Sequence, residues 1–394
     1  MEEIRAQNGM LFLTLEPHGG LSAVTSAVAQ DVAATVAQYN ARGVRVLLRF
    51  AHEMNGSWYA CGQQPAAYVA AFRRVADAVH ASAPGTALVW APNYGGGYPY
   101  TGGTHSARAG TADHAALDTD LSGALTMADD SYAPYYPGDA YVDWVGLTLY
   151  HFGHAWPYGE NETPEADKFA QQLRGTYTGN ARYEDQSAVP DFYQSFAVAR
   201  GKPMAVTETS ALYNETPAQP GDANPEIKSS WIGQVYGAAT QQQFPLLKMA
   251  SWFEVRKYEA EAGGTVDWRA TADPAIRDAL RSRLAGGSYV FASSAPSPPQ
   301  APQAPGTPTG LTGYSTNNPP RAVISWRPPT SDGGAAVSGY LACRTDTGTC
   351  RTLPAGATTT TFDGLQRKTA YTFTVRAVNS AGAGPSAQVT VRVK

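Results

Sequence analysis

The sequence predicts an α/β protein, built on a parallel sheet that helices cover, with an all-β domain at its carboxyl end. Two observations carry this prediction. Short apolar runs recur up to residue 254 with helical patterns between them, and a Pro-, Ala- and Ser-rich stretch then separates them from runs that alternate in polarity. The apolar runs are MLFLTLEP, GVRVLLRFAHE, TALVWAPN, YVDWVGLTLY, KPMAVTETS and PLLKMASWFE.

The helical patterns fit between these predicted strands. Residues 21–43 precede the second run, and residues 65–85 follow it, starting with Pro and ending at Pro-Gly. Repeated βα units favour a (β/α)8 barrel of the TIM type, which has eight strands and typically about 250 residues. Because six such runs are visible and the first begins near residue 10, we expect either a barrel that is completed in an unusual way or one that lacks about two amino-terminal βα units.

The stretch SSAPSPPQAPQAPGTP marks a boundary between domains, because its composition stays extended and cannot bury a core. After it, AVISW, GYLACR and AYTFTVRAVN alternate between two faces and are separated by turn residues, as in a β-sandwich. The predicted organisation is a barrel domain over residues 1–290, a linker over 291–304 and a sandwich domain over 305–394.

The sandwich segment resembles a fibronectin type III domain. The likeness rests on PGTPTGL, PPTSDGGAAVSGY and DGLQRKTAYTFTVRAVNSAGAGPS, and it spans the whole segment. A sandwich this small needs large side chains inside. We therefore expect its core to contain Trp326, Tyr340, Leu365 and Tyr371.

Composition argues against several classes of function. A net charge of -4 with a pI near 6.0 offers no basic surface for nucleic acid, and no apolar run approaches the roughly 20 residues that span a bilayer. The opening MEEIRAQNGM lacks the basic start and apolar centre of a signal peptide. Three cysteines are too few for a zinc site, but Cys343 and Cys350 flank the turn-rich RTDTGT, which predicts a disulfide across a hairpin.

Polar and aromatic residues follow each predicted strand, and in a barrel these carboxyl ends meet at one face. Glu53 and Glu208 occupy equivalent places beyond two buried runs. Glycosidic hydrolysis needs two facing carboxyl groups: one protonates the leaving oxygen and the other attacks the anomeric carbon, with retention of configuration when they lie about 5 to 5.5 Å apart. Either glutamate alone could simply face solvent, but the pair favours a glycoside hydrolase.

The stretches RFAHEMNGSWY and KPMAVTETS resemble the two catalytic motifs of glycoside hydrolase family 26, the β-mannanase family. The resemblance to this family covers most of residues 10–270. The resemblance implies that Glu53 is the acid/base and Glu208 the nucleophile of a retaining endo-β-1,4-mannanase. It also implies a polysaccharide substrate, no metal or cofactor, a monomer, and an extracellular location. Such a mechanism requires Glu53 to carry the raised pKa while hydrogen bonds keep Glu208 ionised.

By the same resemblance, three residues support the nucleophile. Arg49, on the inward face of its strand, orients a catalytic carboxylate, His52 hydrogen-bonds the sugar or Glu208, and Tyr150 donates a hydrogen bond to Glu208. One position departs from the family pattern, since Thr148 stands where many members have an Asp that touches substrate. β-Glucan and β-1,3-xylan, which other members cleave, therefore stay open beside mannan.

Four more residues at strand ends are candidates for substrate binding. Two of them resemble the family's aromatics that stack on sugar rings, although tryptophans also fill barrel cores. The four candidates are Trp58, Trp252, Asn93 and His18. Two alternatives to hydrolysis remain, namely carbohydrate binding without catalysis by an incomplete barrel, and an adhesion role based on the sandwich domain alone.

Overall fold

A computed structural model describes residues 1–154, 158–179, 186–287, 289 and 303–394. The chain divides into two compact units, residues 1–296 and 297–394. The predicted linker over 291–304 lies outside the described residues except for its last two positions. Among the residues that the structure describes, no helix is long and apolar enough to cross a bilayer.

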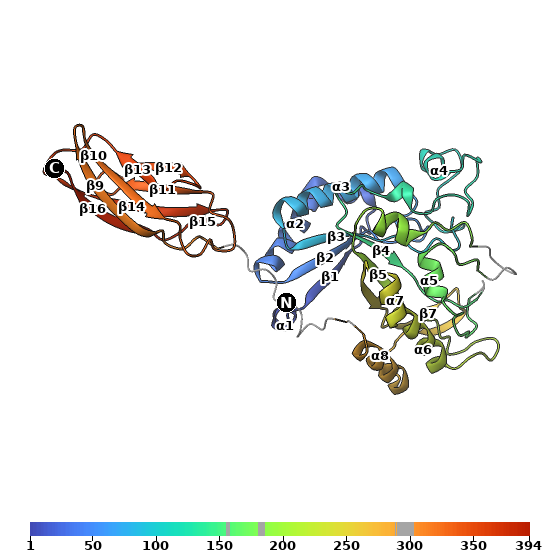
Figure 1. The fold of residues 1–394 in the computed structure, drawn as a ribbon. Coiled ribbons are helices and arrows are strands. Elements are labelled where there is room, and N and C mark those ends of the chain that lie inside the picture. The colour runs from blue at the N-terminus through green and yellow to red at the C-terminus, as the bar shows by residue number, and fades with distance from the viewer. Residues whose placement is uncertain (155–157, 180–185, 288, 290–302) are drawn as a thin grey trace. The chain divides into compact units, whose positions relative to one another are not determined.

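The first unit is built on a six-stranded parallel sheet that curls into a half-barrel (Figure 1). Neighbours in the sheet are neighbours in the sequence, from β1 to β6. This sequential order is that of a TIM-type barrel, whereas a doubly wound sheet reverses its order at a switch point. The predicted α/β barrel class is confirmed. The strands are β1 (Met10–Leu15), β2 (Arg45–Phe50), β3 (Thr86–Trp90), β4 (Trp144–Thr148), β5 (Met204–Thr209) and β6 (Leu247–Trp252).

Each sheet strand has two apolar faces, as expected for a sheet covered on both sides. In β2, Leu48 and Phe50 belong to the large core beneath the helices, while Leu47 packs with Val89 in a smaller cluster on the opposite, concave face. Arg49 alternates with Leu48 and therefore shares the concave face with Leu47. The predicted inward direction of Arg49 follows from this alternation.

Helices cover the convex face of the sheet. The side chain of Thr25 caps α2 by accepting a hydrogen bond from the Val28 N–H, and α3 begins with Pro65 at its first turn. Figure 1 shows α2 and α3 beside strands β1 to β3. The helices are α1 (Glu2–Ala6), α2 (Ser26–Ala41), α3 (Pro65–Ser82), α4 (Ala112–Leu117), α5 (Lys168–Leu173), α6 (Asn224–Val235), α7 (Ala238–Gln243) and α8 (Pro274–Ala285), with short turns η1 (Leu21–Ala23), η2 (Ala133–Tyr135) and η3 (Tyr193–Val198).

A two-stranded hairpin follows β6 directly. Its strands, β7 (Arg256–Glu259) and β8 (Gly264–Asp267), pair antiparallel around a turn in which Gly263 has a φ of 63°. This hairpin was not among the elements predicted above, although Gly263-Gly264 at its turn is a hairpin signal. The segment beyond β8 returns to the carboxyl ends of the sheet strands.

The second unit is a β-sandwich. One sheet has the order β13-β10-β9 and the other β12-β11-β14-β15, with β16 also paired to β14. Trp326, Tyr340, Leu365 and Tyr371 are all buried in its core, as predicted. A disulfide joins Cys343 and Cys350, which are register partners in the β11–β12 hairpin. The strands are β9 (Thr309–Asn317), β10 (Pro320–Arg327), β11 (Gly339–Arg344), β12 (Cys350–Pro354), β13 (Thr359–Phe362), β14 (Ala370–Asn379), β15 (Gly382–Ala383) and β16 (Ala387–Arg392).

Candidate active site

The turn after β2 holds Glu53 in an unusual backbone conformation. Its φ is 55°, and Ala51 has a φ of 45°, both in the left-handed region that costs energy for residues other than glycine. Hydrogen bonds maintain the conformation: the Ala51 N–H donates to the Leu15 carbonyl and the Glu53 N–H to the Ala91 carbonyl. Neighbouring strand ends therefore fix the direction in which Glu53 leaves its strand.

Glu208 lies in β5, level with Thr148 of β4. Its two carboxylate oxygens have different partners. Arg49 places Nη2 2.6 Å from Oε1, and the Tyr150 hydroxyl donates to Oε2 over 2.8 Å. An ion pair and a charge-assisted hydrogen bond both suit a negative oxygen, so the two contacts hold Glu208 as an oriented carboxylate.

Arg49 is itself fixed from a third strand. Its Nε donates to the Thr14 hydroxyl over 2.9 Å, and its guanidinium lies 5.2 Å from the centre of the Phe12 ring. Because Arg49 is only 6% exposed, its charge needs a buried partner, and Glu208 supplies it. Three strands thus contribute to the position of one carboxylate.

The environment of Glu53 favours the protonated carboxyl group. The pKa of Glu53 is raised to about 7, mainly by burial and secondly by the negative charge of Glu208. The Trp58 indole N–H donates to Oε2 over 2.8 Å, which acts in the opposite direction. Burial, the main cause of the raised pKa, and the Glu208 charge together favour a protonated Glu53 at pH values up to about 7.

His52 and Tyr150 both stay neutral around this pair. Burial and the Arg49 charge lower the pKa of His52 to about 4, so its Nε2, 3.8 Å from Glu208 Oε1, forms no ion pair at neutral pH. Burial and the Glu208 charge raise the pKa of Tyr150 far above its ordinary value. Tyr150 therefore keeps its proton and remains a hydrogen-bond donor to Glu208 throughout the working range of most enzymes.

A cavity of about 160 Å³ lies at the ends of β1 and β2, where His52, the residue before Glu53, is among its lining residues. Trp58 and Tyr59 line it and are 42% and 36% exposed, which leaves aromatic surface free for the apolar face of a sugar. His18 also lines the cavity, with its Nε2 3.5 Å from Glu16 and a side chain that is 86% exposed. His18 stands at the cavity wall, not at the carboxylate pair.

Two predicted substrate-binding residues are engaged elsewhere. The Asn93 amide donates to the Tyr100 hydroxyl over 3.2 Å, and its backbone exchanges hydrogen bonds with the Asn55 side chain. The Trp252 indole N–H donates to the Trp268 carbonyl over 2.8 Å. Contact of Asn93 and Trp252 with substrate stays a prediction.

Sequence reasoning missed two residues that shape the site. Asn55 is fully buried and ties the Glu53 turn to the end of β3 through its two hydrogen bonds with Asn93. Its position two residues after Glu53 was the available signal. Trp268, whose ring centre lies 5.2 Å from that of Tyr150, comes from the segment after β8 and carried no signal in the sequence.

One acidic cluster could hold a cation on distance alone. Among the described residues, Asp118, Asp120 and Asp129 place carboxylate oxygens within 4.8 Å of one another. These oxygens already accept hydrogen bonds from backbone N–H groups, for example those of Ser122 and Thr119.

The free cysteine of the first unit is not a candidate nucleophile. Burial raises the pKa of the Cys61 thiol to about 11, so the thiol stays protonated at neutral pH.

The carboxyl pair therefore has two unlike members. Glu53 can deliver a proton, and Glu208 can act as an oriented nucleophile or as a negative charge. A pair of carboxyl groups whose environments separate their protonation states is the arrangement used for acid and nucleophile roles at acetal centres.

Comparison with known proteins bears on both units. Residues 306–392 match the fibronectin type III domain family. A curated relative, endoglucanase H of Acetivibrio thermocellus, is 24% identical over 295 residues, which are 71% of this chain and 25% of the relative's own length. The chain thus spans about a quarter of that protein.

Solved structures similar to the chain include family 26 mannanases. A double mutant of the Cellulomonas fimi endo-β-1,4-mannanase has a TM-score of 0.44 and 17% identity, with 99% of this chain and 78% of that chain covered. The GH26 β-mannanase of Bacteroides ovatus has a TM-score of 0.44 and 15% identity over 75% of this chain and 73% of that chain. Such low values do not transfer a substrate to this protein. The chain thus carries a fibronectin type III domain at residues 306–392, following a half-barrel whose solved neighbours include family 26 mannanases.

Proposed function

We propose that the first unit is a retaining glycoside hydrolase that cleaves β-1,4-mannan within the polymer. The observation that carries the proposal is the unlike carboxyl pair, with Glu53 protonated up to about pH 7 and Glu208 held by Arg49 and Tyr150. The resemblance of RFAHEMNGSWY and KPMAVTETS to the motifs of family 26 supports it.

The proposed reaction has two displacements. Glu208 attacks the anomeric carbon while the Glu53 proton passes to the leaving glycosidic oxygen, which breaks the C–O bond and forms a glycosyl ester on Glu208. A water molecule then attacks the same carbon, Glu53 takes the proton of that water, and the Glu208 carboxylate leaves. Glu53 ends protonated again, so the cycle is balanced.

Mannan is the proposed substrate, and β-glucan is a second candidate. Thr148 supports β-glucan as a candidate substrate, because many family members have at this position an Asp that contacts substrate. The curated relative named an endoglucanase points the same way. The exposed faces of Trp58 and Tyr59 would serve either polymer, since both present apolar C–H faces.

The substrate is tested by release of reducing ends. The purified chain is incubated in parallel with galactomannan, mixed-linkage β-glucan and β-1,3-xylan, and product lengths are compared. We expect the highest kcat/KM on galactomannan, with early release of several oligosaccharide lengths. Preference for glucan by tenfold or more would replace mannan in the proposal, and no release from any polymer would contradict hydrolase function.

The rate should fall on the alkaline side as Glu53 loses its proton. Because the acid must be protonated and its pKa is about 7, we expect kcat/KM to fall about tenfold per pH unit above that value. A pH profile on a soluble oligosaccharide measures this. A rate that stays flat to pH 9 would show that Glu53 is not the acid.

We also propose that the protein works outside the cell. The Cys343–Cys350 disulfide suits an oxidising compartment, as does a polymeric substrate. The sandwich unit would then space or attach the hydrolase unit.

A further inference from the structure

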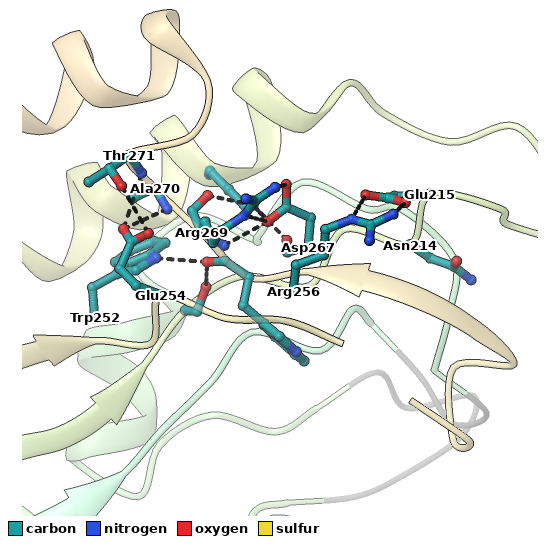
Figure 2. Close-up of polar contacts among 12 residues, drawn as sticks. Asn214, Glu215, Trp252, Glu254, Arg256, Asp267, Arg269, Ala270 and Thr271 are labelled. Atoms are coloured by element: carbon teal, nitrogen blue, oxygen red, sulfur yellow. Dashed lines mark hydrogen bonds and ion pairs between the residues drawn. The ribbon is translucent and has the colours of Figure 1, made fainter. Parts of the chain in front are cut away.

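Three successive backbone carbonyls, starting with that of Asp267 at the end of β8, each accept a hydrogen bond from a side chain of another element. Lys228 of α6 donates through Nζ to the Asp267 carbonyl over 2.6 Å and to the Arg269 carbonyl over 2.8 Å. The carbonyl between them, that of Trp268, accepts from the Ser210 hydroxyl over 2.6 Å and from the Trp252 indole over 2.8 Å. Figure 2 shows the contact from Trp252 together with Asp267 and Arg269.

The backbone N–H groups of the next two residues are also hydrogen-bonded to a side chain. The Glu254 carboxylate accepts the backbone N–H groups of Ala270 and Thr271 over 2.9 and 3.1 Å (Figure 2). Residues 267–271, which run from the last residue of β8 into irregular backbone, thus have a hydrogen bond to a side chain of another element at every position. Irregular backbone is ordinarily free to vary, so tethers this dense indicate that its conformation matters.

Burying the Lys228 ammonium group costs free energy, and side-chain packing alone does not explain why a lysine occupies this position. The Lys228 side chain is completely buried, and among the described residues the carboxylate within 4.0 Å of its Nζ is that of Asp267, at 4.0 Å. Desolvation lowers the pKa of Lys228 to about 8 despite that carboxylate. A leucine or methionine on α6 would fill the space more cheaply, but it would leave two carbonyls without donors.

Trp268 is the residue that this segment presents toward the site. Its ring is 2% exposed and meets Tyr150 edge to face, with centres 5.2 Å apart at 64°. Its indole N–H donates to Glu259 Oε1 over 2.9 Å, which fixes the ring from the β7 side. The Tyr150 hydroxyl in turn donates to Glu208.

We propose that Lys228, Ser210 and Trp252 form a carbonyl clamp that positions Trp268 as a wall for Tyr150, so that the Tyr150 hydroxyl meets Glu208 at the required angle. These are positioning residues, because their side chains donate to the backbone carbonyls of the 267–269 stretch and would act on Glu208 only through Tyr150. The proposal rests on the proposed function for Glu208 and adds a role for a segment outside the strand-end motifs.

A double-mutant cycle tests the step from Trp268 to Tyr150. We expect Tyr150→Phe and Trp268→Leu each to lower kcat by ~10- to 100-fold with little change in KM. The double variant should match Tyr150→Phe alone, because the hydroxyl through which Trp268 acts is already gone. Multiplying losses in the double variant would overturn the proposal.

Lys228→Met tests the clamp itself, with Lys168→Met as control. Lys168 is also buried, and its Nζ donates to the Gly153 carbonyl and pairs with Glu165, outside the 267–271 segment. We expect only Lys228→Met to lower kcat, by ~10-fold or more, and only it to speed hydrogen exchange of the Trp268 and Ala270 N–H groups. Equal losses of kcat in both variants would mean that Lys228 contributes only to the general stability of the fold and does not position Trp268.

The exchange experiment separates this proposal from the proposed function. If the wild-type chain hydrolyses no polysaccharide, the hydrolase proposal fails, while exchange still reports whether Lys228 orders residues 267–271. Should Lys228→Met leave exchange at these N–H groups unchanged, the clamp is wrong whatever the activity. Where Lys228→Met does not fold, Ser210→Ala, which removes a single donor, replaces it in the same two measurements.

Discussion

Glu208→Ala is expected to lower kcat by at least ~10⁴-fold, the largest loss from any single substitution in this chain. The variant has no oxygen to attack the anomeric carbon, and it leaves the Arg49 charge buried without the partner that lies 2.6 Å away. The variant leaves unchanged the cavity-lining rings of Trp58 and Tyr59, which are proposed to contact substrate, so binding should persist. Reducing-end release and calorimetric binding of a mannan oligosaccharide measure the two quantities.

The control for this variant is Glu226→Ala. Glu226 is an exposed glutamate in the first turn of α6, and its replacement should leave kcat unchanged. A 2-deoxy-2-fluoro glycoside with a good leaving group should also trap a glycosyl ester, which mass spectrometry of peptides would locate at Glu208. Turnover near the wild-type rate in Glu208→Ala, or an ester on another residue, would remove Glu208 from the nucleophile role.

Glu53→Gln is expected to lower kcat on polysaccharide by ~10² to 10⁴-fold, because the leaving oxygen then departs without a proton. The amide is similar in size and can still accept from the Trp58 indole, so the fold should survive. An aryl glycoside with an acidic phenol needs no protonation and should form the glycosyl ester quickly. The loss should therefore grow with the pKa of the leaving group, as a series of aryl glycosides would show.

Two further readouts separate an acid/base from a residue that only binds. Azide needs no general base, so it should restore turnover of the aryl glycoside in Glu53→Gln and yield a glycosyl azide of retained configuration. The alkaline fall in rate set by the pKa of about 7 should also disappear in this variant. A loss that is the same for all leaving groups and resists azide would place Glu53 outside proton transfer.

The sequence alone predicted the six strands of the parallel sheet and the fibronectin type III segment at the carboxyl end, but not the β7–β8 hairpin, and the catalytic roles of Glu53 and Glu208 stay predictions. Apolar runs bounded by polar residues indicate strands that are buried on both faces of a sheet. All six runs contain a strand of the parallel sheet. Alternation along β2 predicted an inward Arg49, which meets Glu208. These features are local, because each depends on residues within one strand or on the residue that follows it.

Only the tertiary structure decided how the pair becomes unequal. The pKa of Glu53 depends on its burial and on the charge of a residue 155 positions away, neither of which has a local pattern. Trp252 resembled a sugar-stacking residue, yet its indole donates to the Trp268 carbonyl. Trp268 reaches Tyr150 only because the β7–β8 hairpin returns the chain to the strand ends. Contacts between distant segments set electrostatics and side-chain position, and local periodicity does not encode them.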